Sequence, residues 1–131
     1  MKTLQVRSRR PIEMIDISAD VCEVIREAGV TEGLAVVFTP HTTAAITINE
    51  NADPDVCRDL TMAINKIVPM QDGYRHLEGN SAAHLKSSLL GASETLIINN
   101  GELRLGTWQG IYFCEFDGPR QRQVQVQVIS Q

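Results

Sequence analysis

All three histidines in the sequence stand among glycines, prolines and polar residues. His76 and His84 lie in the glycine-punctuated stretch Gly73–His84, and His41 directly follows Pro40. Neutral imidazole is a preferred ligand of zinc and related ions, and three imidazoles with an open fourth position are typical of a catalytic metal site. The sequence therefore predicts that His41, His76 and His84 bind a divalent metal ion. The competing interpretation is that one or two of them are surface or capping histidines.

A second kind of site is predicted at the end of the same stretch. Gly79, Asn80 and Ser81 stand where a helix is expected to begin, so free backbone N–H groups and the positive end of the helix dipole are available to an anion. A phosphate group is the natural ligand, and Arg75 or Lys86 would assist. Asn80 and Ser81 are therefore predicted to bind a phosphorylated substrate, although Asn80 would serve equally well as an ordinary helix cap.

Four further charged residues are candidates for catalysis. Glu50 follows an expected strand and Glu78 lies two residues after His76, so either carboxylate is placed to act as a base or to orient a histidine. Glu50 is equally compatible with a simple role before a helix. Asp117 and Arg120 flank a Gly-Pro turn, where they would contact substrate or form a salt bridge with each other.

A glycine-bracketed turn, Gly106–Gly110, carries the only tryptophan of the chain. Thr107 and Gln109 are predicted to hydrogen-bond a ligand there, with Trp108 as an apolar wall. Several common enzyme classes are disfavoured, because the sequence contains no G-x-S-x-G elbow, no G-x-G-x-x-G fingerprint and no phosphate-binding P-loop motif.

Hydrophobic periodicity and capping residues indicate the elements that must position these side chains. Helices are expected over about Ala19–Ala28, over about Pro54–Ile67, and from Asn80 or Ser81 to about Leu90. Strands are expected over 3–9, 12–17, 34–39, 42–49, 94–99, 102–105, 110–117 and 123–129. The pattern predicts an α+β domain of about seven strands and two or three helices, in which helices cover mainly antiparallel sheets. The last strand alternates valine with glutamine, so its polar face is expected to meet solvent or a partner subunit.

Composition limits the architecture and the partners of the chain. The 131 residues are expected to form a single domain, 1–131. A net charge of −4 and a pI near 5.3 lack the basic field of a nucleic-acid-binding protein. No apolar run is long enough to span a membrane and the N-terminus lacks the apolar core of a signal peptide, so the cytoplasm is the expected location. Cys22, Cys57 and Cys114 form no C-x-x-C pair and are expected to be buried thiols.

Several motifs in order carry a resemblance to a known family. They are His41-Thr42-Thr43-Ala44, the run from Ile48 to Val56, the loop from Tyr74 to His84, Gly106-Thr107-Trp108-Gln109, and Asp117-Gly118-Pro119-Arg120. With these motifs the sequence closely resembles the YjbQ-like family over essentially its whole length. The resemblance implies a compact α+β sandwich of two mainly antiparallel sheets that assembles as a homotrimer, with sites near subunit boundaries.

The resemblance also implies an activity, that of a secondary thiamine-phosphate synthase. This transferase joins a hydroxymethylpyrimidine diphosphate to a thiazole phosphate and releases diphosphate. Zinc on the three histidines, or magnesium with the diphosphate, would be the cofactor, and Arg120 with the helix start at Asn80 would stabilise the leaving group. Two alternatives stay open: a metal-dependent hydrolase with Glu50 or Glu78 as its base, and a non-catalytic trimer that binds a metal or a small molecule.

Overall fold

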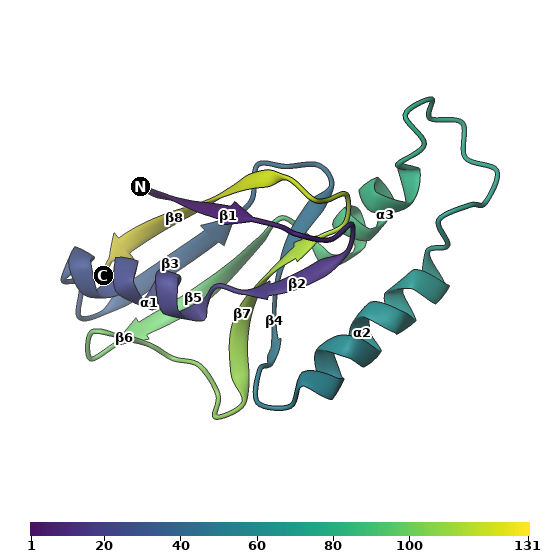
Figure 1. The fold of residues 1–131 in the computed structure, drawn as a ribbon. Helices are drawn as coiled ribbons and strands as arrows, with labels where there is room; N and C mark the ends of the chain where they lie inside the picture. Colours follow the sequence, from purple (N-terminus) through teal and green to yellow (C-terminus); the bar gives the residue numbers. More distant parts are fainter.

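The computed structural model describes residues 1–131 and contains three helices and eight strands (Figure 1). The helices are α1 (Ser18–Ala28), α2 (Pro54–Ile67) and α3 (Ser81–Leu90). The strands are β1 (Lys2–Arg7), β2 (Glu13–Asp16), β3 (Gly33–Phe38), β4 (Ala44–Glu50), β5 (Ser93–Asn99), β6 (Glu102–Leu103), β7 (Gln109–Glu115) and β8 (Gln121–Ser130).

The strands form two antiparallel sheets that face each other. One sheet has five strands in the order β1-β8-β3-β5-β6, and the other has three in the order β2-β7-β4. The predicted α+β fold with two antiparallel sheets is therefore confirmed, and each of the eight ranges expected to form a strand overlaps one.

The main hydrophobic core lies between the two sheets. Val37, Val124 and Val126 enter it from the five-stranded sheet, and Ile46 and Phe113 enter it from the three-stranded sheet. Each of these side chains is at most 1% exposed. Alternate residues of a strand point to opposite faces, so the valines predicted to alternate along β8 point inward and the intervening glutamines point outward.

Helix α1 packs its predicted apolar face onto this core. Val21, Val24 and Ile25 are the buried residues of the helix. Ser18 lies in the first turn of the helix, and its hydroxyl accepts a hydrogen bond from the Ile111 N–H at 2.8 Å. The hydroxyl thereby ties the start of α1 to β7.

Helix α2 has the predicted bounds but does not bury its apolar stripe. Asp53 caps it by accepting a hydrogen bond from the Asp55 N–H at 2.9 Å, and Pro54 begins it. None of its residues is buried, and Leu60 and Ile67 are 38% and 69% exposed. In Figure 1 the helix lies beside the strands and leads into the loop that returns to α3.

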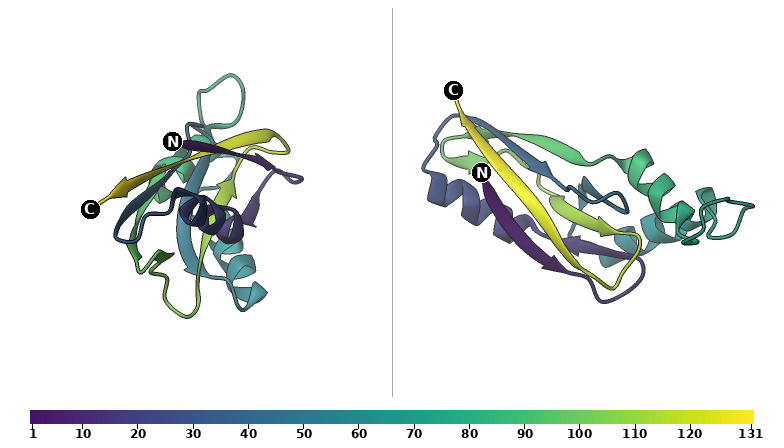
Figure 2. Two further views of the ribbon diagram at one scale, coloured as in Figure 1. Left: turned by 90° about the vertical axis from the view of Figure 1, so that its left-hand side faces the viewer. Right: turned by 90° about the horizontal axis from the view of Figure 1, so that it is seen from above.

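The loop between α2 and α3, residues 68–80, carries two of the predicted site residues. His76 and Glu78 lie in it, a few residues before α3 begins at Ser81. Figure 2 shows the loop projecting from the end of the molecule that α2 and α3 occupy. None of the three helices is long and apolar enough to cross a membrane.

A buried ion pair ties together four segments, of which the end of β1, Thr43 and the β7–β8 region are distant from one another in the sequence. Glu115 is 0% exposed and accepts hydrogen bonds from the Arg122 guanidinium, from the Ser8 hydroxyl at 2.6 Å and from the Asp117 N–H at 3.0 Å. Arg122 also donates to the Thr43 hydroxyl at 2.8 Å. Burial would raise the pKa of Glu115, but these hydrogen bonds outweigh it and hold the pKa below its ordinary value.

Replacing Glu115 by alanine should strongly destabilise the fold. Glu115→Ala leaves the Arg122 guanidinium buried without a counter-charge, so we expect the free energy of unfolding to fall by about 3–5 kcal/mol. Arg58→Ala is the matched control, because its ion pair with Asp55 lies at the surface and is expected to contribute at most about 1 kcal/mol. Chemical denaturation measures both. Equal losses in the two variants would show that the buried pair does not hold the segments together.

Candidate functional site

A polar pocket lies where three of these segments, those of Thr43, Asp117 and Arg122, meet the loop before α3. Its volume is about 450 Å³, and none of its eleven lining residues is hydrophobic. The lining residues come from the β3–β4 connection, the loop before α3, α3 itself, the β7–β8 turn and the start of β8: Pro40, His41, Thr42, Thr43, His76, Glu78, Asn80, His84, Asp117, Arg120 and Arg122. We call it the histidine pocket, because it brings together all three histidines of the chain.

His76 and His84 lie against each other in the histidine pocket. Their rings meet edge to face, with centroids 5.5 Å apart and planes at 84°. His84 stands in the first turn of α3, as predicted. His76 lies in a tight turn, closed by a 3.1 Å hydrogen bond from the Gly79 N–H to its carbonyl. Ser81 lines an adjoining hollow together with both histidines.

His41 is held by the backbone of β8. Its Nε2 accepts a hydrogen bond from the Gln123 N–H at 2.9 Å, so the neutral ring carries its proton on Nδ1. Burial lowers the pKa of His41, and the positive charges of Arg122 and Arg120 lower it further against the opposing effect of Glu115. These effects favour the neutral form of the His41 imidazole.

Asn80 supplies an acceptor that has no donor. Its amide nitrogen donates to Asp117 Oδ2 at 2.8 Å, and the same oxygen accepts from Arg120 at 3.0 Å. The side-chain oxygen of Asn80 is buried and has no hydrogen-bond partner. Asn80 occupies the N-cap position of α3 but makes no capping hydrogen bond with its side chain. An acceptor left in this state destabilises a fold by about 1–3 kcal/mol unless another molecule donates to it.

The three histidines do not form the predicted metal centre. No three histidine, cysteine or acidic side chains are grouped as a metal ion requires. Zinc ligands converge on one ion at about 2.0–2.1 Å from each imidazole nitrogen. Here the Nε2 of His41 is hydrogen-bonded to the backbone, and His76 and His84 meet edge to face. The predicted three-histidine metal site is therefore wrong, whereas a divalent ion that enters with a phosphorylated ligand stays a prediction.

Four predicted site residues lie together at a different place. Glu50 is paired with Gln109 across β4 and β7, and Trp108 is 61% exposed in the turn beside it. The side chain of Gln109 closes this turn by accepting a backbone hydrogen bond at 2.8 Å. At about 3.3 Å per residue, the length of β4 puts roughly 20 Å between these residues and the histidine pocket. The catalytic role of Glu50 and the ligand-binding roles of Thr107, Trp108 and Gln109 stay predictions.

Arg122 and Thr43 line the histidine pocket although neither is among the predicted site residues. A sequence signal exists for Arg122, which occupies the same face of β8 as Val124 and Val126 and is only 4% exposed. A charge at an inward position of a strand needs a buried counter-charge. Glu115, at the end of the buried run of β7, meets that requirement.

Comparison with known proteins places the chain among close relatives. The family described as UPF0047 protein YjbQ-like matches residues 2–131. The chain is 52% identical over 131 residues to the UPF0047 protein YugU of Bacillus subtilis, with 99% of each protein covered. It is 50% identical over 126 residues to the UPF0047 protein MJ1081 of Methanocaldococcus jannaschii, with 96% of this chain and 91% of that protein covered.

Two crystal structures share the fold closely. An uncharacterized conserved protein of the yjbq/upf0047 family from Clostridium acetobutylicum superposes with a TM-score of 0.97 at 53% identity, covering 98% of this chain and 100% of that one. A YbjQ-like protein of unknown function from Sulfolobus solfataricus superposes with a TM-score of 0.96 at 30% identity, covering 99% and 96%.

These relatives correct the predicted activity. YugU and MJ1081 bear only the family designation, and the Sulfolobus protein is described as having unknown function. They lend no support to a thiamine-phosphate synthase, so the prediction of a transferase of thiamine biosynthesis is wrong. The alternative of a hydrolase that acts through a three-histidine metal ion is also wrong, because the required ligand group is not formed.

The environment of His41 predicts its titration. We expect its pKa to lie below the ordinary imidazole value of about 6.5, since burial and two guanidinium groups disfavour its charged form. Arg120→Met removes one of those charges from a half-exposed position and should raise the pKa of His41, whereas Arg58→Met on α2 should leave it unchanged. NMR titration of the imidazole resonances measures these values and should show the Nδ1–H tautomer. A wild-type pKa at or above 6.5 would contradict this environment.

Proposed function

The chain belongs to the UPF0047 YjbQ-like family, and we propose that it is an enzyme whose histidine pocket binds a small phosphorylated molecule. The observation that carries this proposal is the buried, unpaired side-chain oxygen of Asn80 in a pocket without hydrophobic lining. Native structures rarely leave such an acceptor without a donor. A ligand that donates to Asn80 completes the hydrogen bonding that the chain alone leaves open.

Several donors in the same pocket suit a phosphate group. Arg120 uses its Nε and one Nη2 hydrogen on Asp117, so three of its five N–H hydrogens are left for a ligand. The ring N–H groups of His76 and His84 add to these. Helix α3 begins beside them at Ser81, where unpaired backbone N–H groups and the helix dipole favour an anion. The phosphate is therefore assigned to the side of the pocket formed by Arg120 and the start of α3.

The remaining groups indicate what else the ligand carries. The oxygen of Asn80 only accepts hydrogen bonds, and the Glu78 carboxylate takes part in none of the salt bridges of the chain. A phosphate ester with a hydroxyl or amino group satisfies the donors and the acceptors together, so this is the ligand class that we propose.

Proton transfer is the chemistry that the pocket supports best. Imidazole gives and takes protons near neutral pH, and His76 and His84 lie together in the pocket with Glu78. His41 has a fixed orientation, because its Nε2 is bound to β8, and it presents a neutral ring. We assign His76 and His84 as the proton carriers, and His41 as a neutral group that orients the ligand.

A homotrimer in the cytoplasm remains our proposal for the working state. Leu34, Ile97 and Ile129 lie side by side across β3, β5 and β8 on the outer face of the five-stranded sheet and are 41%, 59% and 50% exposed. On the same face, the strand neighbours of Val36 and Phe38 on β5 and β8 are only threonine, serine and glutamine. An exposed apolar row bordered by uncharged residues is typical of the core of a subunit interface. The three free cysteines fit a reducing compartment.

Ligand binding tests the proposed function. We expect a phosphate ester with a hydroxyl or amino group, such as glycerol 3-phosphate or phosphoethanolamine, to stabilise the protein in a thermal-shift assay. The gain is about 2.7 kcal/mol when the ligand is present at one hundred times its Kd. Asn80→Ala should weaken binding about three- to tenfold, because one hydrogen bond is lost.

His84→Ala should weaken the same binding, whereas Leu89→Ala on the exposed side of α3 is the control and should leave it unchanged. Stabilisation of the Asn80→Ala and His84→Ala variants equal to that of the wild type would place the ligand elsewhere and overturn the proposal.

The oligomeric state tests the outer face of the five-stranded sheet. Size-exclusion chromatography with light scattering should give three times the 14.5 kDa mass of the chain. Ile97→Lys places a charge at the most exposed position of the apolar row and should produce a monomer. Leu77→Lys makes the same change at a fully exposed loop position and should leave the trimer intact. A wild-type monomer would rule this proposal out.

A further inference from the structure

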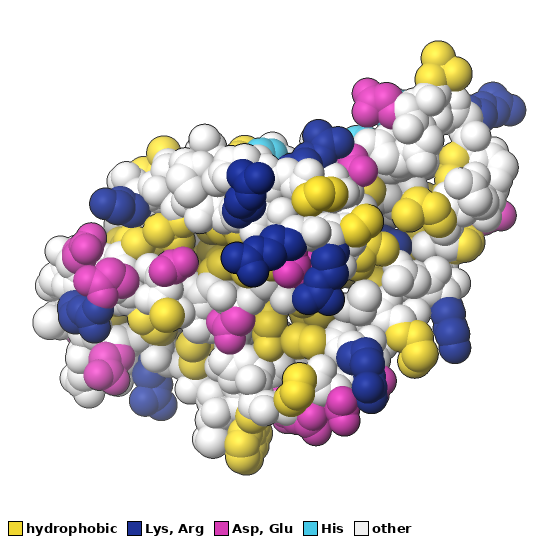
Figure 3. Space-filling model, in the orientation of Figure 1, with side chains coloured by type: hydrophobic (Ala, Val, Ile, Leu, Met, Phe, Trp, Pro, Cys, Tyr) yellow, Lys and Arg dark blue, Asp and Glu magenta, His cyan; other side chains and the backbone are white.

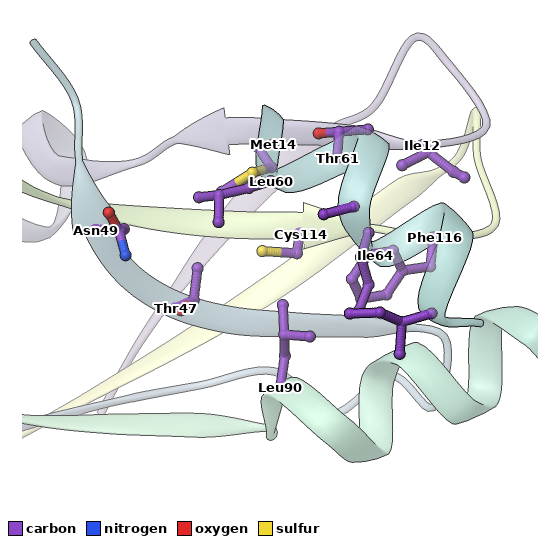
Figure 4. A pocket seen from close by; sticks show the side chains of 12 residues that line it. Ile12, Met14, Thr47, Asn49, Leu60, Thr61, Ile64, Leu90, Cys114 and Phe116 are labelled. Atoms are coloured by element: carbon purple, nitrogen blue, oxygen red, sulfur yellow. The ribbon is translucent and has the colours of Figure 1, made fainter. Parts of the chain in front are cut away.

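A second pocket, apolar in character, lies between α2 and the three-stranded sheet. It has a volume of about 220 Å³, and nine of its twelve lining residues are hydrophobic. Figure 4 shows Leu60 and Ile64 from α2 on one side, Cys114 of the sheet beneath, and Leu90 of α3 pointing toward the same space. It shares no lining residue with the histidine pocket. Hydrophobic side chains are also visible along the junction of α2 with the strands in Figure 3.

The size of this pocket limits what fills it. Protein interiors are packed about as densely as organic crystals, so an apolar helix face held off a sheet leaves dispersion contacts unmade. The volume exceeds the roughly 150 Å³ of an apolar cavity known to hold benzene, and it falls short of the roughly 300 Å³ at which drug-sized ligand sites begin. One ring or a short alkyl chain fills it.

A buried lysine lies next to one end of the pocket, although it is not one of the twelve lining residues. Lys86 of α3 is 1% exposed, its ammonium donates to the Asn65 side-chain oxygen at 2.6 Å, and it lies 5.9 Å from the centre of the Phe116 ring. Phe116 lines the pocket, as does Ile64, the neighbour of Asn65 on α2. Lys86 takes part in no salt bridge, and burial alone lowers its pKa. The cation therefore has one neutral partner and no counter-charge.

We propose that the pocket binds a small apolar carboxylic acid, with its carboxylate paired to Lys86 at the end formed by Ile64 and Phe116. Buried charges in proteins are almost always paired, and a carboxylate is the counter-charge that Lys86 lacks. The ring or chain of the ligand packs against Leu60 and Leu90. It thereby covers the apolar side of α2, which the rest of the chain does not bury. Binding makes and breaks no covalent bond, and it does not depend on the ligand of the histidine pocket.

Matched probes test the charge. Phenylacetate and phenylacetamide have nearly the same size, but only phenylacetate carries a negative charge. Isothermal titration calorimetry on the wild type should give a Kd at least about tenfold lower for phenylacetate, because hydrogen bonds between charged groups are stronger than those to a neutral amide. Lys86→Met keeps the apolar stem and should bring the two Kd values together. Ala63→Phe fills the pocket from α2 and should abolish the binding of both probes.

His84→Ala is the control that separates this site from the histidine pocket, and it should leave phenylacetate binding unchanged. The proposal is overturned if neither probe binds the wild type at millimolar concentration, or if the two probes bind it equally. The proposal is also overturned if Lys86→Met still prefers phenylacetate to phenylacetamide. It is overturned too if the wild type binds neither probe and Ala63→Phe has a lower oligomer mass, because the pocket would then be a contact between copies of the chain. The wild-type comparison decides the matter even if Lys86→Met fails to fold.

Discussion

The buried ion pair between Glu115 and Arg122 determines where the polar segments of this molecule lie. Glu115 does not line the histidine pocket, yet it holds the end of β1 through Ser8, the β7–β8 turn through Asp117 and the start of β8 through Arg122. Arg122 extends the connection to Thr43 at the start of β4. A charge pair in the interior requires all of its hydrogen bonds to be made at once, so the four segments keep one relative arrangement.

Helix α3 divides the two pockets. Ala82, Ala83 and Ser87 are its buried residues on the side of β4, and their small size lets the helix lie close to that strand. The Ser87 hydroxyl donates to the Ala44 carbonyl at 2.6 Å and adds a fixed contact. With the helix held in this way, His84 faces the polar pocket near its start, while Leu90 faces the apolar pocket at its end.

Local chemistry made most of the fold predictable. The bounds of α2 follow from Asp53, Pro54 and the three-and-four spacing of its apolar residues, and the inward face of β8 follows from alternating valines. The apolar stripe of α2 shows which side of the helix avoids water. It does not show how closely the helix approaches the sheet, because that distance depends on the loops at both ends of the helix. For this reason its incomplete burial could not be read from the sequence.

The candidate site was predictable in membership more than in arrangement. Motifs indicated all three histidines, Glu78, Asn80, Asp117 and Arg120, which line one pocket. The relation among the imidazoles depends on contacts made only after folding, such as that between Gln123 and the Nε2 of His41. Ligand sets that converge on a metal and histidines that pack against each other have the same sequence pattern, so residue types alone did not distinguish them.

The bond between Gln123 and His41 has a consequence for the sheet itself. The pairing of β3 with β8 ends where Phe38 lies opposite Gln125. Two residues later Pro40 interrupts the chain, so β3 does not continue to supply the next backbone carbonyl to β8. The imidazole nitrogen of His41 stands in for that carbonyl as the final rung of the ladder. A ring that takes up a proton on Nε2 can no longer accept this hydrogen bond, so protonation of His41 would loosen the end of the β3–β8 pairing.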